Sequence, residues 1–245
     1  MAETIIGRNA VLEALKGNRE IEKITVARGA EGSVKQITGK AKAKKIPLYY
    51  SDRARMDRDA QGGSHQGVIA VVSDYRYATV DEILAKAEGL GEKPFVMILD
   101  GLEDPHNLGA IMRTAECAGV HGIIIPKRRS VSVNETVAKT SAGASEYMLC
   151  ARVTNIAREI DKLKERGLWI GACDMDGEIY SGQDLTGSIG MVIGSEGFGI
   201  SRLVREKCDF VVSIPMKGRI TSLNASNAAS ILMYEIVRQR LAEQG

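Results

Sequence analysis

The chain has 245 residues, of which 44% are hydrophobic and 26% are charged, a balance that is typical of a folded globular protein and excludes general disorder. No apolar run is long enough to cross a membrane and no signal peptide is visible at the start, so the expected compartment is the cytoplasm. The four cysteines and three histidines are scattered, which argues against a disulfide framework and predicts no metal site.

The net charge of +2 is unevenly distributed along the chain. Residues 1–75 hold 13 Lys and Arg against 9 Asp and Glu, whereas the remaining residues hold 20 against 22. Eight basic residues and only two acids lie between Lys35 and Arg58. A polyanion such as RNA would favour this stretch, although a charge run on its own is more often a solvated helix face.

The first part of the chain predicts a small α/β unit over residues 1–75. Its pattern favours two helices, at 8–16 and 33–44, and three strands, at 24–26, 48–50 and 68–72. Residues 76–93 have the composition of a linker, with a short helix at 80–87 followed by Gly89 and Gly91.

From Phe95 onward, apolar runs recur at regular intervals. They predict strands at 95–99, 122–125, 147–151, 168–172, 189–193 and 210–214. Helical patterns lie between most of these strands, most clearly at 156–166. This alternation predicts an α/β domain over 94–245, with a mostly parallel sheet and helices on both faces. Such sheets bind ligands beyond the carboxyl ends of their strands.

The segment after strand 95–99 leads into a helix. We expect this helix to begin near Asn107, with Asn107 as its N-cap. Arg113 would then lie on its second turn, near the end of the helix that faces a ligand. Taken alone, Arg113 is most simply a surface arginine.

The segment after strand 189–193 contains Gly194, Gly197 and Gly199, with Glu196 among them. These glycines permit tight turns and a close approach of the backbone to a ligand. Their spacing matches neither the dinucleotide fingerprint nor the Walker loop, which disfavours a nucleotide-dependent dehydrogenase.

The segment after strand 210–214 is a polar loop that leads into a helix rich in small residues at 225–230. One interpretation is close packing of this helix against another backbone. The other is that Ser222 and Asn224 present polar groups to a pocket, near a helix N-terminus that favours electron-rich ligand groups.

Taken together, these segments resemble the three ordered motifs of the SpoU family, RNA ribose 2'-O-methyltransferases of the knotted SPOUT class. The matching residues are N-x-G-x-I-x-R-T at 107–114, G-S-E-G at 194–197 and I-P-M-x-G-x-x-x-S-L-N-A-S at 214–226. The first part of the chain resembles the family's substrate-binding domain, through I-x-G-R-N-A-V ending at Val11 and S-H-Q-G-V at 64–68.

The resemblance implies an L30e-like RNA-binding domain and a Rossmann-like domain whose C-terminal part forms a trefoil knot. It further implies a homodimer that binds S-adenosylmethionine in the knot. By position, the residues that would contact this cofactor are Gly194, Ser195, Gly197, Ile214, Met216 and Leu223.

The resemblance also implies catalytic roles. Arg113 would be essential, either in handling the proton of the ribose hydroxyl or in stabilising the alkoxide. The first role is chemically awkward, because a guanidinium has a pKa above about 12 and normally only donates. Glu196 is the rival base. Asn107 would fix the substrate or Arg113, and Ser222 and Asn224 would shape the pocket.

Within the family, the two-domain length is most similar to members that methylate a guanosine in the peptidyl-transferase P loop of 23S rRNA. That makes 23S rRNA the expected substrate. The alternatives are a tRNA ribose methyltransferase, a resistance enzyme acting on another rRNA loop, and an rRNA-binding relative that has lost catalysis.

Overall fold

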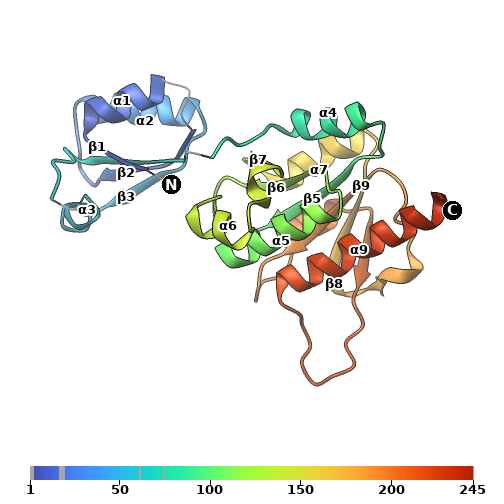
Figure 1. Ribbon diagram of the computed structural model, residues 1–245. Helices are drawn as coiled ribbons and strands as arrows, with labels where there is room; N and C mark the ends of the chain where they lie inside the picture. The colour runs from blue at the N-terminus through green and yellow to red at the C-terminus, as the bar shows by residue number, and fades with distance from the viewer. Residues whose placement is uncertain (1–2, 17–19, 61, 74, 245) are drawn as a thin grey trace. The chain divides into compact units, whose positions relative to one another are not determined.

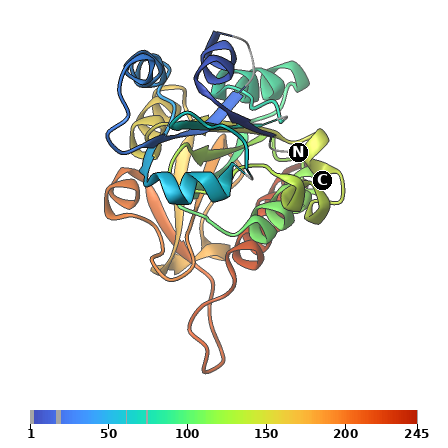
Figure 2. The same cartoon turned by 90° about the vertical axis from the view of Figure 1, so that its left-hand side faces the viewer.

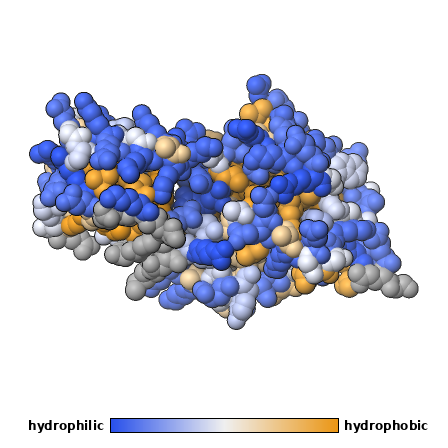
Figure 3. Space-filling view, turned by 90° about the horizontal axis from the view of Figure 1, so that it is seen from above, coloured by the Kyte–Doolittle hydropathy of each residue, from blue (hydrophilic) through white to orange (hydrophobic). Residues whose placement is uncertain are grey.

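The computed structural model describes residues 3–16, 20–60, 62–73 and 75–244. The chain divides into two compact units, Met1–Arg76 and Tyr77–Gly245, which are called the small unit and the large unit below. Polar side chains cover most of the surface visible in Figure 3, and apolar side chains form scattered groups. No helix in the described part of the chain is long and apolar enough to cross a membrane.

The small unit is a four-stranded sheet with helices on both faces. The strand order is β1-β4-β2-β3, in which β2 and β3 are parallel and the other pairs are antiparallel. Helices α1 and α2 cover one face, and α3 lies on the other (Figures 1 and 2). The elements are β1 (Glu3–Ile6), α1 (Arg8–Lys16), β2 (Glu20–Ala27), α2 (Ser33–Ala43), β3 (Leu48–Ser51), α3 (Arg53–Asp59) and β4 (Val68–Ser73).

The basic residues between Lys35 and Arg58 point away from the core of the small unit. Helix α2 buries Val34, Ile37 and Ala41 and leaves its lysines exposed or half-exposed, while α3 buries Met56 and exposes its arginines. Because α2 and α3 lie on opposite faces of the sheet, the basic residues are divided between two faces and do not form a single charged helix surface.

The large unit is a six-stranded sheet in which every pairing is parallel. The strand order β10-β8-β9-β5-β6-β7 places β5 and β9 in the centre. The strands are β5 (Phe95–Asp100), β6 (Gly122–Pro126), β7 (Leu149–Val153), β8 (Trp169–Ile179), β9 (Ile189–Gly194) and β10 (Phe210–Ser213). The parallel sheet predicted from the apolar runs is therefore confirmed.

Helices cover both faces of this sheet, as predicted (Figure 1). One face carries α4, α7 and α8, whose buried Ile83, Ile160 and Val204 belong to one apolar cluster with the strands. The other face carries α5 and α9, which contact each other, and α6 packs against α5. The helices are α4 (Val80–Leu90), α5 (Pro105–Cys117), α6 (Glu135–Thr140), α7 (Ile156–Glu165), α8 (Arg202–Lys207) and α9 (Ala225–Gln244), with single 3-10 turns at Ala144–Glu146 and Tyr180–Gly182.

Residues 77–93, which the sequence assigns to a linker over 76–93, belong to the large unit. Helix α4 begins with a capping box between Thr79 and Glu82 and buries Ile83 and Ala87 completely. The hydroxyl of Tyr77 accepts a hydrogen bond from the Val133 amide at 2.8 Å. A segment that contributes fully buried side chains is part of the fold, so the linker interpretation is corrected.

Two strands of the large unit differ from the sequence prediction, and the difference in β8 affects the site. Strand β7 begins at Leu149 rather than at 147, because residues 144–146 first form a 3-10 turn. Strand β8 continues to Ile179 rather than ending at 172, since its second half pairs with β10 beyond a register shift between Val211 and Val212. Gly177 permits this pairing, because a Cβ there would collide with the backbone of β10.

Candidate active site

A cavity of about 830 Å³ lies where β9 and β10 end and where β8 separates from β9. Its walls are the turn 194–199 after β9, the loop 214–224 after β10 and residues 173–175 of β8. The loop 214–224 extends from the body of the large unit (Figures 1 and 2). All six residues predicted to contact a cofactor line this cavity, namely Gly194, Ser195, Gly197, Ile214, Met216 and Leu223.

The glycine turn after β9 is closed on itself. The amide of Ser195 donates to the Gly199 carbonyl and the amide of Gly199 donates to the Ser195 carbonyl, each at 3.0 Å. Gly197 and Gly199 have φ values of 91° and 66°, in the left-handed region that favours glycine. A Cβ on Gly194 would collide with the Gly199 backbone, so the turn requires glycine at 194 as well.

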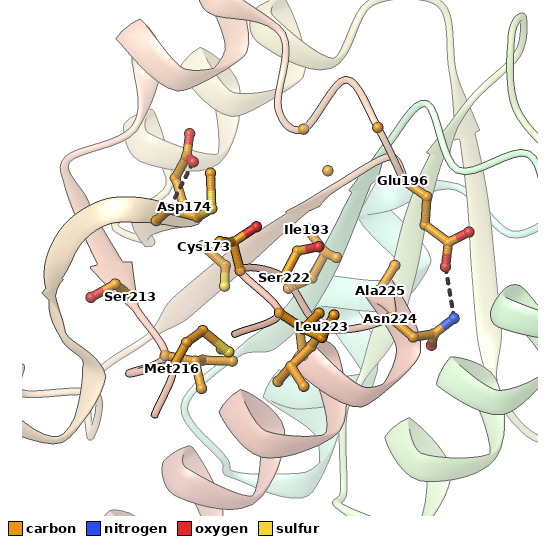
Figure 4. A pocket seen from close by; sticks show the side chains of 18 of the residues that line it. Cys173, Asp174, Ile193, Glu196, Ser213, Met216, Ser222, Leu223, Asn224 and Ala225 are labelled. Atoms are coloured by element: carbon orange, nitrogen blue, oxygen red, sulfur yellow. Dashed lines mark hydrogen bonds between the residues drawn. The ribbon is translucent and has the colours of Figure 1, made fainter. Parts of the chain in front are cut away.

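Three predicted catalytic residues form one hydrogen-bonded network at the side of the cavity. Asn107 donates from Nδ2 to Glu196 Oε1 at 3.0 Å, and Asn224 donates from Nδ2 to the same oxygen at 2.7 Å. Asn224 Nδ2 also donates to Asn107 Oδ1 at 2.9 Å. Figure 4 shows Glu196 and Asn224 facing each other on one side of the cavity, with Cys173 and Asp174 on the other side. The arrangement holds one carboxylate oxygen with two amide donors.

The amide orientation of Asn224 is fixed by helix α9. Its Oδ1 accepts from the Ser226 amide at 2.9 Å and from the Ser226 hydroxyl at 2.6 Å, which makes Asn224 the N-cap of the helix. With Oδ1 turned to these donors, Nδ2 faces Glu196. Asn224 therefore performs its predicted pocket role through Nδ2 and its capping role through Oδ1.

The expectation that Asn107 caps α5 is wrong. The N-cap is Asp104, whose carboxylate accepts from the His106 amide at 2.9 Å, and Pro105 is the first helical residue. Proline suits this position, since its fixed φ fits the helix and its missing N–H leaves no unpaired donor. Asn107 is instead a buried residue inside the first turn, and its side chain is free for Glu196.

Unlike Asn107, which reaches the cavity-lining Glu196 through a hydrogen bond, Arg113 makes no hydrogen bond to a cavity-lining residue within the described part of the chain. It is exposed on α5 and is not among the cavity-lining residues. Six residues along a helix correspond to a rotation of about 600°, so Arg113 leaves α5 about 120° away from Asn107. Within the described residues Arg113 forms no hydrogen bond or salt bridge. Ser222, by contrast, lines the cavity as predicted.

Sequence reasoning missed the wall that β8 contributes. Cys173 and Asp174 line the cavity, but the sequence predicted the end of this strand at 172. Burial raises the pKa of the Cys173 thiol to about 11, so the thiol is protonated near neutral pH and is a poor nucleophile. Asp100 was also missed: its Oδ2 accepts from the Ser201 amide at 2.8 Å and ties the end of β5 to the segment after the glycine turn. The described residues contain no group of three or more His, Cys, Asp and Glu arranged to hold a metal ion.

The comparisons with known proteins agree with this geometry. The SpoU rRNA methylase family model matches residues 94–234, and the model for RNA 2'-O ribose methyltransferase substrate binding matches residues 4–78. YacO of Bacillus subtilis, assigned by its name to the TrmH family of tRNA/rRNA methyltransferases, is 49% identical over 96% of this chain and 95% of its own.

Solved structures share the fold. The SpoU methyltransferase AviRb of Streptomyces viridochromogenes, crystallised with AdoMet, is 24% identical and superposes with a TM-score of 0.63 over 98% of this chain and 91% of its own. The A. aeolicus TrmH/SpoU tRNA modifying enzyme is 27% identical, with a TM-score of 0.57 over 67% of this chain and 85% of its own.

The chain belongs to the SpoU family of RNA methyltransferases. Its activity is the S-adenosylmethionine-dependent methylation of RNA at a ribose 2'-hydroxyl. The family resemblance carried by the three motifs is thus confirmed.

Proposed function

We propose that this enzyme methylates the ribose of a guanosine in the P loop of 23S rRNA, in the cytoplasm, with catalysis centred on Glu196. The observation that carries the site assignment is the network in which Asn107 and Asn224 hold one oxygen of Glu196 beside the cavity. The match to the SpoU rRNA methylase family model supports an rRNA target, and the match of the small unit to a substrate-binding family model supports the binding of an RNA substrate by that unit.

The cavity suits S-adenosylmethionine. Its volume of about 830 Å³ lies in the range of small-molecule sites. Ile214 and Leu223 offer apolar walls for an adenine, and the glycine turn exposes backbone groups that can read its edge. The carboxylate of Glu196 favours a ligand with sulfonium and ammonium charges, whereas that of Asp174 is already paired with Arg205. When bound, the cofactor supplies a methyl group already activated on sulfur.

The chain's own contribution is to orient the ribose hydroxyl and to accept its proton. Glu196 Oε1 already receives two amide hydrogen bonds, and Oε2 receives none from the described residues. Oε2 is therefore the acceptor that we assign to the 2'-hydroxyl proton. Arg113 is assigned the complementary role, in which its fixed positive charge stabilises the alkoxide as it forms.

This role for Arg113 calls for a second copy of the chain. Arg113 is exposed on α5 and does not line the cavity of its own chain. Tyr234 and Leu241, on the neighbouring α9, are 51% and 63% exposed and offer apolar surface for a partner. We therefore propose a homodimer that brings Arg113 of each protomer to the cavity of the other. The L30e-like character of the small unit and a trefoil knot around the loop 214–224 are part of the same proposal.

The identity of the RNA substrate is the part of the proposal to test first. The names of the relatives combine tRNA and rRNA, which keeps tRNA as the second candidate. The experiment maps 2'-O-methylation in the rRNA and tRNA of a deletion strain with and without this chain. A single restored site in the 23S P loop supports the proposal. A restored site in tRNA instead would replace the rRNA target.

A further inference from the structure

Three consecutive cations follow strand β6 at the edge of the sheet that bears the active site. β6 ends at Pro126, and Lys127, Arg128 and Arg129 come next; these three residues are called the basic turn. Because β6 runs parallel to β5, the basic turn leaves the sheet at the same edge as the segment that carries Asn107. Neither the sequence motifs nor the proposed mechanism uses these residues.

The backbone of the basic turn is fixed at both ends. The amide of Lys127 donates to the Val153 carbonyl at 2.8 Å, and the Lys127 carbonyl accepts from Arg152 Nη2 at 3.2 Å. Beyond the turn, the Val131 amide donates to the Leu102 carbonyl at 2.8 Å. The turn is thus anchored to β7 on one side and to the β5–α5 loop on the other.

Gly101 lies between the basic turn and the glycine turn of the active site. A Cβ placed on Gly101 would lie 3.8 Å from the Arg129 carbonyl oxygen and 3.8 Å from Ser195 Cβ. Arg129 has a φ of 53°, a left-handed conformation that is unfavourable for arginine. A conformation of this kind persists where the surrounding structure enforces it, and such residues cluster at functional sites.

The three side chains are free to bind a ligand. Arg128 and Arg129 are exposed and Lys127 is half-buried. None of the three forms a salt bridge within the described part of the chain. Arg166, Arg205 and Arg238, elsewhere in the large unit, each have a carboxylate partner. In the neighbouring β5–α5 segment, Asp100 accepts from Ser201 and Asp104 caps α5, while Glu103 is exposed.

From this placement we infer that the basic turn binds the RNA phosphates that flank the methylated ribose. The inference rests on the proposed function. A 2'-hydroxyl is joined through its own ribose to the phosphates on either side, so a strand whose ribose enters the cavity brings phosphates to the rim. Glu196 would repel them, and the basic turn supplies the opposite charge next to it. Contacts of this kind fix the register of the strand without reading its sequence.

The test is the double variant Arg128→Ala/Arg129→Gly in the full chain, with Arg166→Ala as the matched control. Glycine accommodates the positive φ at 129, so the fold is retained. Arg166 follows α7 at the opposite edge of the sheet, just before β8. Binding of a fluorescein-labelled P-loop RNA stem-loop is measured by anisotropy over a range of salt concentrations. Binding of S-adenosylmethionine is measured by calorimetry.

The double variant is expected to bind the RNA about tenfold more weakly at low salt, with the slope of log K against log salt reduced by about 1 to 2. Its cofactor affinity and melting temperature should match the wild type, and Arg166→Ala should change neither RNA affinity nor slope. An unchanged RNA affinity and slope overturns the inference. So does a loss of cofactor affinity, because the turn would then serve the cofactor. Methyl transfer by the wild type to RNA from a deletion strain is the separate arm that decides the proposed function.

Discussion

Asn107 donates a hydrogen bond from its side-chain amide to Glu196 Oε1 at 3.0 Å, across 89 positions of sequence. This contact joins the helix that follows β5 to the turn that follows β9. β5 and β9 are the two central strands of the sheet. It makes the carboxylate of Glu196 a group of fixed orientation rather than a mobile surface acid.

The Asn107–Glu196 contact can be tested by substitution at position 107. Asn107→Ala should lower the single-turnover rate of methyl transfer by about tenfold to a hundredfold, the range expected for a hydrogen bond to a charged group. Asn107→Asp should lower it further, because a second carboxylate would face Glu196.

The control for this substitution is Asn155→Ala, which removes the N-cap of α7. It should cost about 1 kcal/mol of stability and leave the transfer rate unchanged. If Asn107→Ala and Asn155→Ala each lose activity in proportion to their loss of stability, the role assigned to Asn107 is wrong.

Substitutions at Arg113 and Glu196 test whether each active site is built from residues of both protomers of the proposed homodimer. Arg113→Ala and Glu196→Gln chains, each inactive alone, are mixed and allowed to exchange subunits. If each site takes Arg113 from one protomer and Glu196 from the other, mixed dimers contain one intact site. Random pairing makes half of the dimers mixed, so about a quarter of the wild-type activity should return. If both residues of a site come from one chain, the mixture stays inactive.

Gly194 is expected to be required for cofactor binding. Gly194→Ala places a methyl group against the Gly199 backbone and should open the turn, lowering S-adenosylmethionine affinity by at least about tenfold. Gly89→Ala, in α4, meets nothing within 4 Å and serves as the control. Calorimetry that gives equal affinities for both variants would remove the glycine turn from the cofactor site.

His121 predicts the direction of the pH dependence of stability. Its Nδ1 accepts from the Phe95 amide at 2.9 Å and its Nε2 lies 3.0 Å from Glu92, and burial lowers the pKa of the imidazole below its ordinary value of 6.5. The unfolded chain therefore binds the proton more readily. The contribution of His121 to stability is present above pH 6.5 and is lost as the pH falls below it.

The melting temperature should consequently decrease when the pH is lowered from 7.5 to 5.5. In His121→Asn, whose side-chain oxygen can replace Nδ1 as the acceptor, the fall should be smaller. Equal pH dependence in the two proteins would assign the effect to other groups.

The parallel sheet of the large unit could be predicted from sequence because each of its strands contains a short apolar run, although β8 continues beyond its run to Ile179. The site could be predicted only in part. Its motifs identified Asn107, Glu196 and Asn224, but the shared oxygen depends on contacts among three distant segments. The N-cap of α5 was misassigned because Asp104 and Asn107 are both good capping residues, and Pro105 decides between them.

Two further features lay outside the reach of sequence patterns. Gly89 and Gly91 suggested a linker, yet Ile83 and Ala87 pack α4 into the core. The wall formed by Cys173 follows from the pairing of β8 with β10, which requires the structure of both strands.

The double use of Asn224 couples the folding of α9 to the orientation of Glu196, the carboxylate to which we assign the proton transfer. One end of its amide caps the helix and the other holds Glu196. Fraying of the first turn of α9 would release both contacts together, so an enzyme with a frayed turn would keep its sheet and lose the orientation of Glu196. Under the proposed mechanism, local melting at the start of one helix would be enough to switch off chemistry in a molecule that remains folded.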